Sequence, residues 1–252
     1  MDCTLSRPVD IAEAKNSPPG KGASCLTYIA SDGITYYVRA EFPRDTFPKP
    51  MGGIFVNKPL SSEGVYTYMI GANGDVYYAQ AFNEYEIGSQ HSSIAIHANL
   101  DKIRAAGELK RDAEGLKYNF MSGTYMADWQ EGCNEASVGK ILAEKLGEPV
   151  TFSAKAFKLP KTVTKEWLDY YVKQGVVFKL FTTVAACRAS VASLNAMLAV
   201  QKRMASHPAR DAIIAKAEAE LAAANAGVVY TGGRRRKTRR HRVKRRRYTR
   251  HR

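Results

Sequence analysis

In the first half of the chain, apolar and polar residues alternate over short runs that are separated by turn-forming residues. The turns are Ser31–Gly33, Ala72–Asp75 and Asp112–Gly115, and the runs beside them are rich in Tyr, Val and Ile. A period of two is typical of strands, and Asp, Asn and Gly between two strands favour hairpins. The run HSSIAIH, residues 91–97, also alternates and is predicted to be a strand. We therefore expect residues 26–130 to form an antiparallel β-meander or a partial barrel.

After Trp129 the period changes to that of helices. The runs NEASVGKILAEKLG (134–147) and TKEWLDYYVKQG (164–175) each begin with a capping residue and end at a glycine. Their apolar residues recur at spacings of three and four, which predicts one buried face on each helix. Short β-rich runs lie between and after them at 150–157 and 176–181. These runs indicate a small α+β unit.

Helical spacing continues from residue 182. Val184, Cys187, Val191, Leu194 and Leu198 predict one long helix that ends before His207-Pro208. A shorter Ala-rich helix is expected next, with Ile213, Ile214, Ala217 and Leu221 on its apolar face. We expect both helices to pack on the body or on a second copy of the chain.

The predicted class is thus α+β, in four parts. They are a flexible lead-in (1–25), the antiparallel β domain (26–130), an α+β and helical region (131–226) and a disordered tail rich in Arg and Lys (227–252).

Positive charge is concentrated at the end of the chain. Residues 231–252 contain 13 Lys or Arg and no Asp or Glu, whereas the whole chain has 38 basic and 24 acidic residues. The other 230 residues therefore carry 25 basic against 24 acidic groups and are nearly neutral. Charge runs of this density do not pack and favour a polyanionic partner. The basic residues are Arg234, Arg235, Arg236, Lys237, Arg239, Arg240, Arg242, Lys244, Arg245, Arg246, Arg247, Arg250 and Arg252.

The remaining composition excludes several classes of protein. Cys3, Cys25, Cys133 and Cys187 form no C-x-x-C pair, so neither a zinc ribbon nor a thioredoxin-type motif is present. Four cysteines in 252 residues are too few for a disulfide-dense secreted scaffold, and we expect a reducing compartment. No secretory signal, membrane span or cofactor motif is found, so the chain is expected to be soluble, not secreted and without a cofactor.

Three polar residues of the β region form a weak candidate catalytic site. If consecutive strands are antiparallel, His91, Glu108 and Tyr125 meet near one end of the sheet as a base, a carboxylate and a hydroxyl. The simpler interpretation is that His91 and Tyr125 are half-buried and bonded to turn backbone, with Ser122 and Gly123 serving the turn. We favour this interpretation, because the spacing contains neither a metal-ligand pattern nor a nucleophile elbow.

The stretch from Val65 to Tyr125, with the motifs GDVYY, HSSIAI, AAGEL and SGTYM in this order, resembles a domain in uncharacterised proteins of giant nucleocytoplasmic large DNA viruses. The tail, YTGGRRRKTRRHR, is similar to the Gly-Gly plus Arg/Lys ending of many proteins from these viruses. The resemblance implies a viral protein made in an infected cell, in the nucleus or a cytoplasmic virus factory, and carried in the virion. It implies no activity. Related patterns often have His at the position of Thr124, so histidine-dependent chemistry there is not expected.

These observations predict a viral structural or accessory protein. Its tail would bind nucleic acid without sequence specificity, while the neutral body contacts other viral proteins or a second copy. Two alternatives stay open. One is an enzyme with a polar site at His91, Glu108 and Tyr125. The other is a host-targeted binding protein whose tail is a nuclear localisation signal, with an import receptor or an acidic protein surface as the tail's partner.

Overall fold

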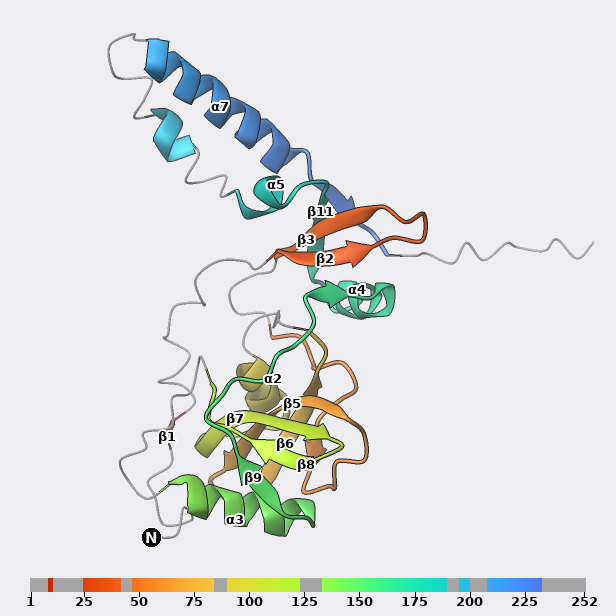
Figure 1. Ribbon diagram of the computed structural model, residues 1–252, viewed down its shortest axis with the longest axis vertical. Coiled ribbons are helices and arrows are strands. Elements are labelled where there is room, and N and C mark those ends of the chain that lie inside the picture. The colour runs from red at the N-terminus through yellow and green to blue at the C-terminus, as the bar shows by residue number, and fades with distance from the viewer. Residues whose placement is uncertain are drawn as a thin grey trace, which may run out of the picture.

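Two β-sheets, each with helices packed on it, form the body of the protein (Figure 1). The predicted α+β class is confirmed, and neither sheet closes into a barrel within the residues described. The computed structural model describes residues 9–10, 25–41, 47–83, 90–122, 133–189, 195–199 and 208–232. The main helices are α2 (Gln90–His97), α3 (Glu135–Leu146), α4 (Lys165–Val172), α5 (Val184–Arg188) and α7 (Pro208–Asn225).

The first sheet, sheet A, has the strand order β4-β6-β5-β7-β8-β9, and β1 pairs with β7. Its pairs are antiparallel except β8 with β9, and the hairpin turns predicted at Ala72–Asp75 and Asp112–Gly115 are confirmed. Its strands are β1 (Val9–Asp10), β4 (Phe55–Val56), β5 (Gly64–Gly71), β6 (Val76–Ala81), β7 (Lys102–Asp112), β8 (Gly115–Tyr118) and β9 (Val150–Phe152).

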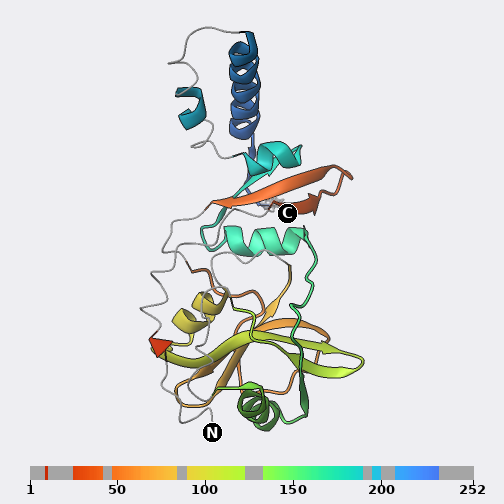
Figure 2. The same ribbon diagram turned by 60° about the vertical axis from the view of Figure 1, so that its left-hand side comes forward.

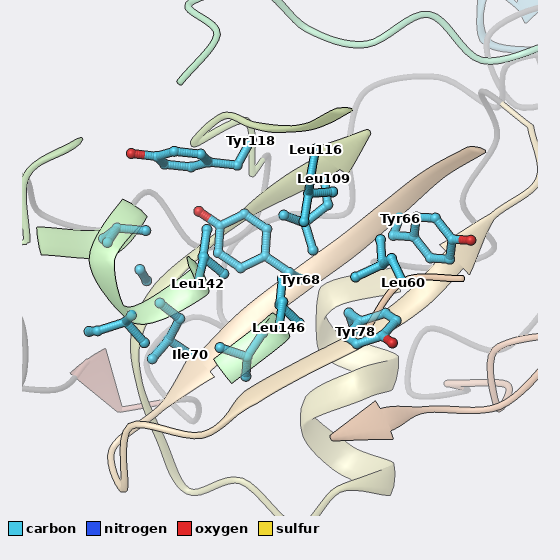
Figure 3. Packing of buried hydrophobic residues seen from close by; sticks show 14 of the residues in the cluster. Leu60, Tyr66, Tyr68, Ile70, Tyr78, Leu109, Leu116, Tyr118, Leu142 and Leu146 are labelled. Carbon is cyan, nitrogen blue, oxygen red and sulfur yellow. The ribbon is translucent and has the colours of Figure 1, made fainter. Parts of the chain in front are cut away.

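Helices cover both faces of sheet A, and strand β5 is therefore buried along nearly its whole length. On one face, Tyr68 shares a core with Leu142 of α3 (Figure 3). On the other face, Met69 shares a smaller core with Ile94 of α2. Successive side chains of a strand point to opposite faces, so one strand supplies both cores.

The prediction of a strand in HSSIAIH is wrong, because residues 90–97 form helix α2. Five consecutive side chains, His91 to Ala95, are buried, whereas a half-buried strand would bury alternate ones. Ile94 and Ala95 pack on sheet A, and the helix end at His97 bonds to Phe47 O with 2.9 Å between the atoms. The run is too short for its alternation to distinguish a strand from a helix.

The second sheet, sheet B, has the order β10-β2-β3-β11-β12, and its pairs are antiparallel except β10 with β2. It combines strands that precede β4 in the chain with strands that follow β9, so the sheets do not divide at residue 130. Its edge strand β12 comes from residues that the sequence assigns to the tail. The strands are β2 (Leu26–Ile29), β3 (Thr35–Glu41), β10 (Thr162–Val163), β11 (Val177–Phe181) and β12 (Val228–Tyr230).

Helices α3 and α4 begin where their caps predict. The Asn134 side chain accepts a hydrogen bond from Ser137 N, and Ser137 Oγ accepts one from Asn134 N, which together form a capping box. Thr164 Oγ1 accepts from Trp167 N in the same way. Helix α3 ends at Gly147, whose φ of 77° is left-handed.

The long helix predicted from residue 182 is interrupted. Helix α5 ends at Arg188, and Ala189 is extended, with ψ 122°. Arg39 of β3 explains the break, because its Nη1 donates to the carbonyl oxygens of Cys187 (3.1 Å) and Ala189 (2.8 Å). These carbonyls are thereby tied to sheet B instead of to a further helical turn. The following Ala-rich helix is confirmed as α7, which projects away from sheet B (Figure 1).

A disulfide joins Cys25, at the start of β2, to Cys187 of α5, with 6.0 Å between the Cα atoms. Cys187 is fully buried, as its place on an apolar stripe predicts. Cys133 is also disulfide-bonded. This pairing does not fit the expectation of reduced cysteines, because disulfides are rare in reducing compartments.

Helix α4 lies between sheet B and the part of the molecule that contains sheet A (Figure 2). Trp167 and Leu168 face the core of sheet B. The helix and the turn after it also bond to the segment before β4: Tyr170 OH of the helix donates to Pro50 O at 3.1 Å, and Gln174 Oε1 of the turn accepts from Lys49 N at 2.7 Å. The two sheets are therefore linked through α4 as well as through the chain.

Candidate functional site

Buried polar side chains gather where α2 begins over strands β5 and β7. Burying a polar group costs free energy unless it is hydrogen-bonded, so such a concentration is a feature to explain. Six of the eight polar residues that are buried in the described ranges belong to α2 or bond to α2 or β7. They are Thr67, His91, Ser92, Ser93, Asn119 and Ser122.

His91 is at the centre of this polar cluster, and only 3% of its surface is exposed. Its Nε2 lies 3.1 Å from Gly107 O, and its Nδ1 lies 3.4 Å from Ser122 Oγ. A carbonyl oxygen only accepts, so Nε2 carries the proton and Nδ1 accepts a hydrogen bond from the Ser122 hydroxyl. Desolvation lowers the pKa of His91 to about 4, against the raising effects of the Gly107 bond and the Glu108 charge. The imidazole is therefore neutral at physiological pH.

Glu108 is held by the segments that leave sheet A. Its Oε2 accepts from Asn119 Nδ2 at 2.8 Å and from Phe157 N at 3.1 Å. The same Asn119 amide donates to Lys155 O at 3.2 Å, and its Oδ1 accepts from Glu108 N at 3.0 Å. Glu108 thus secures the connection from β9 to β10 and carries its charge beside His91.

The backbone at Gly107 approaches residue 119 so closely that a side chain would not fit. A Cβ on Gly107 would lie 2.0 Å from Asn119 O and 2.9 Å from the Tyr68 ring. The Tyr68 hydroxyl donates to the same Asn119 O at 3.0 Å. The motif AAGEL therefore needs its glycine for packing against residue 119.

Thr67 and Gln90 complete the cluster on the strand side. Thr67 is the cross-strand partner of Glu108, so both side chains lie on the α2 face of sheet A. Thr67 Oγ1 donates to Gln90 Oε1 at 2.6 Å, and Gln90 Nε2 donates to Gln80 O at 2.9 Å. In contrast, the buried hydroxyl of Ser93 has no hydrogen-bond partner within the described part of the chain.

Two of the three candidate residues predicted from the sequence come together. His91 and Glu108 lie at one site and bond to the same segment, residues 119–122, through Ser122 and Asn119. Tyr125 lies outside the described residues. The sequence pattern predicts a turn at Ser122 and no role for Asn119. The signal for Ser122 was its place in the SGTYM motif, whereas nothing in the sequence pattern marks Asn119.

The root of the basic tail is the second candidate site. Strand β12 pairs with β11, and the Tyr230 hydroxyl donates to Asp169 Oδ1 at 2.6 Å. A shallow hollow of about 550 Å³, lined by Val177, Val229 and Thr231 among others, lies beside this strand. The thirteen basic residues, Arg234 to Arg252, lie outside the described residues, so the structure describes where the tail is attached.

Comparison with known protein families, curated sequences and solved structures finds no match to this chain. In the described ranges, no three His, Cys, Asp or Glu residues are arranged to hold a metal ion. No helix in the same ranges has the length and apolar character to cross a membrane.

Proposed function

We propose that the protein is a viral structural or accessory protein that binds nucleic acid through its C-terminal tail. The observation that carries the proposal is the separation of charge: the tail has 13 basic and no acidic residues, and the rest of the chain is nearly neutral. Phosphate binding by Lys and Arg releases counterions, so it supplies affinity without reading sequence. The resemblance of the motifs and the tail to proteins of giant DNA viruses supports a place in the virion.

The attachment of the tail supports its use as an anchor. Strand β12 and the Tyr230–Asp169 bond fix the chain to sheet B four residues before Arg234, the first basic residue of the tail. A force that a bound partner exerts on the tail therefore acts on a strand that is hydrogen-bonded into sheet B. The neutral body is free of a general attraction to nucleic acid and is suited to protein contacts.

A gel-shift titration against double-stranded DNA of mixed sequence tests this function. The truncation belongs after Gly232, because an end at or before Val229 would remove Tyr230 with its bond to Asp169 and shorten or remove β12. With about 8 phosphate contacts, raising the salt from roughly 50 to 200 mM should lower the affinity of the full chain by about four decades. The truncated chain should bind weakly at every salt concentration.

A variant with all thirteen basic tail residues replaced by Gln is the matched control, because it keeps the tail's length. Equal binding by the full chain and this variant would contradict the proposal. Import of a reporter fused to residues 231–252, without affinity of the tail for DNA, would instead favour a nuclear localisation signal. The place in the virion is tested by mass spectrometry of purified particles, where high copy number is expected.

A further inference from the structure

The orientation of the His91–Ser122 hydrogen bond is the one that general-base catalysis needs. Gly107 O fixes the proton on Nε2, so Nδ1 is left as the basic nitrogen that faces the Ser122 hydroxyl. A hydroxyl becomes a nucleophile when a neighbouring base takes its proton, and that base works best when a third group fixes its tautomer. Here Ser122, His91 and the Gly107 carbonyl occupy these three places.

We propose that Ser122 is a nucleophile, with His91 as its general base, in the hydrolysis of an uncharged ester or thioester. This activity is independent of the tail and goes beyond nucleic-acid binding. His91 and Ser122 are the catalytic residues of the proposal, whereas Gly107 and Glu108 are positioning residues.

The reaction has two halves. In the first, Ser122 Oγ bonds to the acyl carbon while its proton passes to His91 Nδ1. The bond from the acyl carbon to the leaving oxygen or sulfur then breaks, and Nδ1 returns the proton to the leaving group. In the second half, water gives a proton to Nδ1 and attacks the acyl-serine, and Ser122 Oγ leaves and regains that proton. The products are a carboxylic acid and an alcohol or thiol.

The surroundings select the substrate class. Ile94, Ala95 and Ala106 are fully buried next to the polar cluster, so the environment of the pair is largely apolar. The Glu108 carboxylate beside His91 disfavours an anionic acyl group and stabilises the imidazolium that forms during attack. Because burial makes His91 a weak base, an ester or thioester, which expels its leaving group readily, fits better than an amide.

The serine of the pair lies at the edge of the polar cluster. Met121 is 45% exposed, whereas its neighbour Ser122 is 6% exposed, so the chain passes from the surface into the polar cluster at this serine. The Ser93 hydroxyl, two residues from His91, is buried without a hydrogen-bond partner in the part of the chain that the structure describes. Ser93 follows His91 by two positions in α2, so its hydroxyl lies on a different side of the helix and takes no part in the proposed reaction.

The test is covalent labelling of the full-length protein with a fluorophosphonate probe, followed by peptide mass spectrometry. Hydrolysis of p-nitrophenyl butyrate is measured in parallel. We expect one adduct, on Ser122, and a loss of at least about 100-fold in both rates for Ser122→Ala and His91→Gln. Ser93→Ala is the control for the label, since it should not abolish the adduct on Ser122. His97→Gln, at the exposed end of the same helix, is the control for histidine.

The variants are compared only after circular dichroism and thermal unfolding show that they are folded. If His91→Gln does not fold, Ser122→Ala decides the question, because it removes only one hydroxyl. Failure of the folded wild-type protein to react, labelling at another residue, or full esterase activity in Ser122→Ala would each overturn the proposal. Truncation after Gly232 should leave labelling unchanged, so the outcome does not depend on the function of the tail.

Discussion

Folding removes His91 from water, and its imidazole then resists protonation. Its pKa falls from 6.5 to about 4, so between these values the unfolded chain binds a proton that the folded protein does not. The neutral, buried imidazole therefore makes its full contribution to the free energy of unfolding above pH 6.5. This contribution is lost as the pH falls towards 4. From the two values, the free energy of unfolding should decrease by about 3 kcal/mol across this window.

Urea unfolding at pH 7 and at pH 4.5 measures this loss. His91→Gln should be less stable than wild type at pH 7 but should show a smaller difference between the two pH values. His97→Gln, which replaces an exposed histidine, is the control. A pH dependence that is identical in wild type and His91→Gln would show that another group is responsible.

Gly107 is the residue at which adding a single methyl group should destabilise the fold most. In Gly107→Ala the new Cβ would lie 2.0 Å from a backbone oxygen, which has no flexible end that can move away. We expect a loss of about 3 kcal/mol or more in the free energy of unfolding, measured by urea titration.

The matched control for Gly107 is Gly139→Ala in helix α3. There the Cβ would meet the Tyr118 hydroxyl at 2.9 Å, which belongs to a side chain, and alanine favours the helix. Gly139→Ala should therefore lower the free energy of unfolding by much less than Gly107→Ala. Equal losses in the two variants would mean that the backbone around Gly107 can shift.

At the scale of the element, the disulfide between Cys25 and Cys187 should stabilise sheet B strongly. It closes a loop with a sequence separation of 162 residues, and it holds α5 against β3. Loss of the bond should cost about 2 to 5 kcal/mol, because it frees the unfolded chain.

Unfolding of the wild-type protein with and without dithiothreitol measures this cost. Cys187→Ser should unfold at a lower urea concentration than the wild type. Dithiothreitol should then lower the urea midpoint of this variant by less than it lowers that of the wild type. The remaining effect of reductant reports on the second disulfide, that of Cys133. An unchanged midpoint in Cys187→Ser would contradict a stabilising role.

The elements that are predictable from the sequence are those whose signals are local. Asn134 and Thr164 cap their helices, and Asp, Asn and Gly form the hairpin turns, because these effects act within a few residues. The end of α5 is not predictable, because it depends on Arg39, which lies about 150 residues away in the chain. The candidate site divides in the same way. His91 and Glu108 are visible as residue types, whereas Asn119 acquires its role only when β7 and β8 pair.

Across the whole molecule, charge and stability should be separable. Truncation after Gly232 removes all thirteen tail cations and lowers the formal net charge from +14 to +1, since 25 basic and 24 acidic residues remain. Strand β12 and the Tyr230–Asp169 bond stay intact, so the thermal midpoint should change by less than about 2 °C. Differential scanning calorimetry measures the midpoint, and cation-exchange chromatography should show weaker retention.

A truncation after Gly227, which also removes β12, is the contrasting variant. It exposes the edge of β11 and the aromatic ring of Tyr28, against which Tyr230 packs edge-on at 6.0 Å between ring centroids. Its midpoint should fall clearly below that of the full chain. Equal midpoints for the two truncations would show that β12 contributes nothing to sheet B.

Sheet B also imposes an order in time on the synthesis of the protein. Its strands β2 and β3 are made before strands β4 to β9 of sheet A, yet their partner β11 and the closing strand β12 are made last. All strands of sheet A have been synthesised by residue 152, whereas sheet B waits for residue 230. At about 5 to 20 residues per second, this interval lasts roughly 4 to 16 seconds. Until β11 and Cys187 have been made, the β2–β3 hairpin and Cys25 lack their partners, and β11 then lacks β12 until residue 230, so the nascent chain is exposed to mispairing.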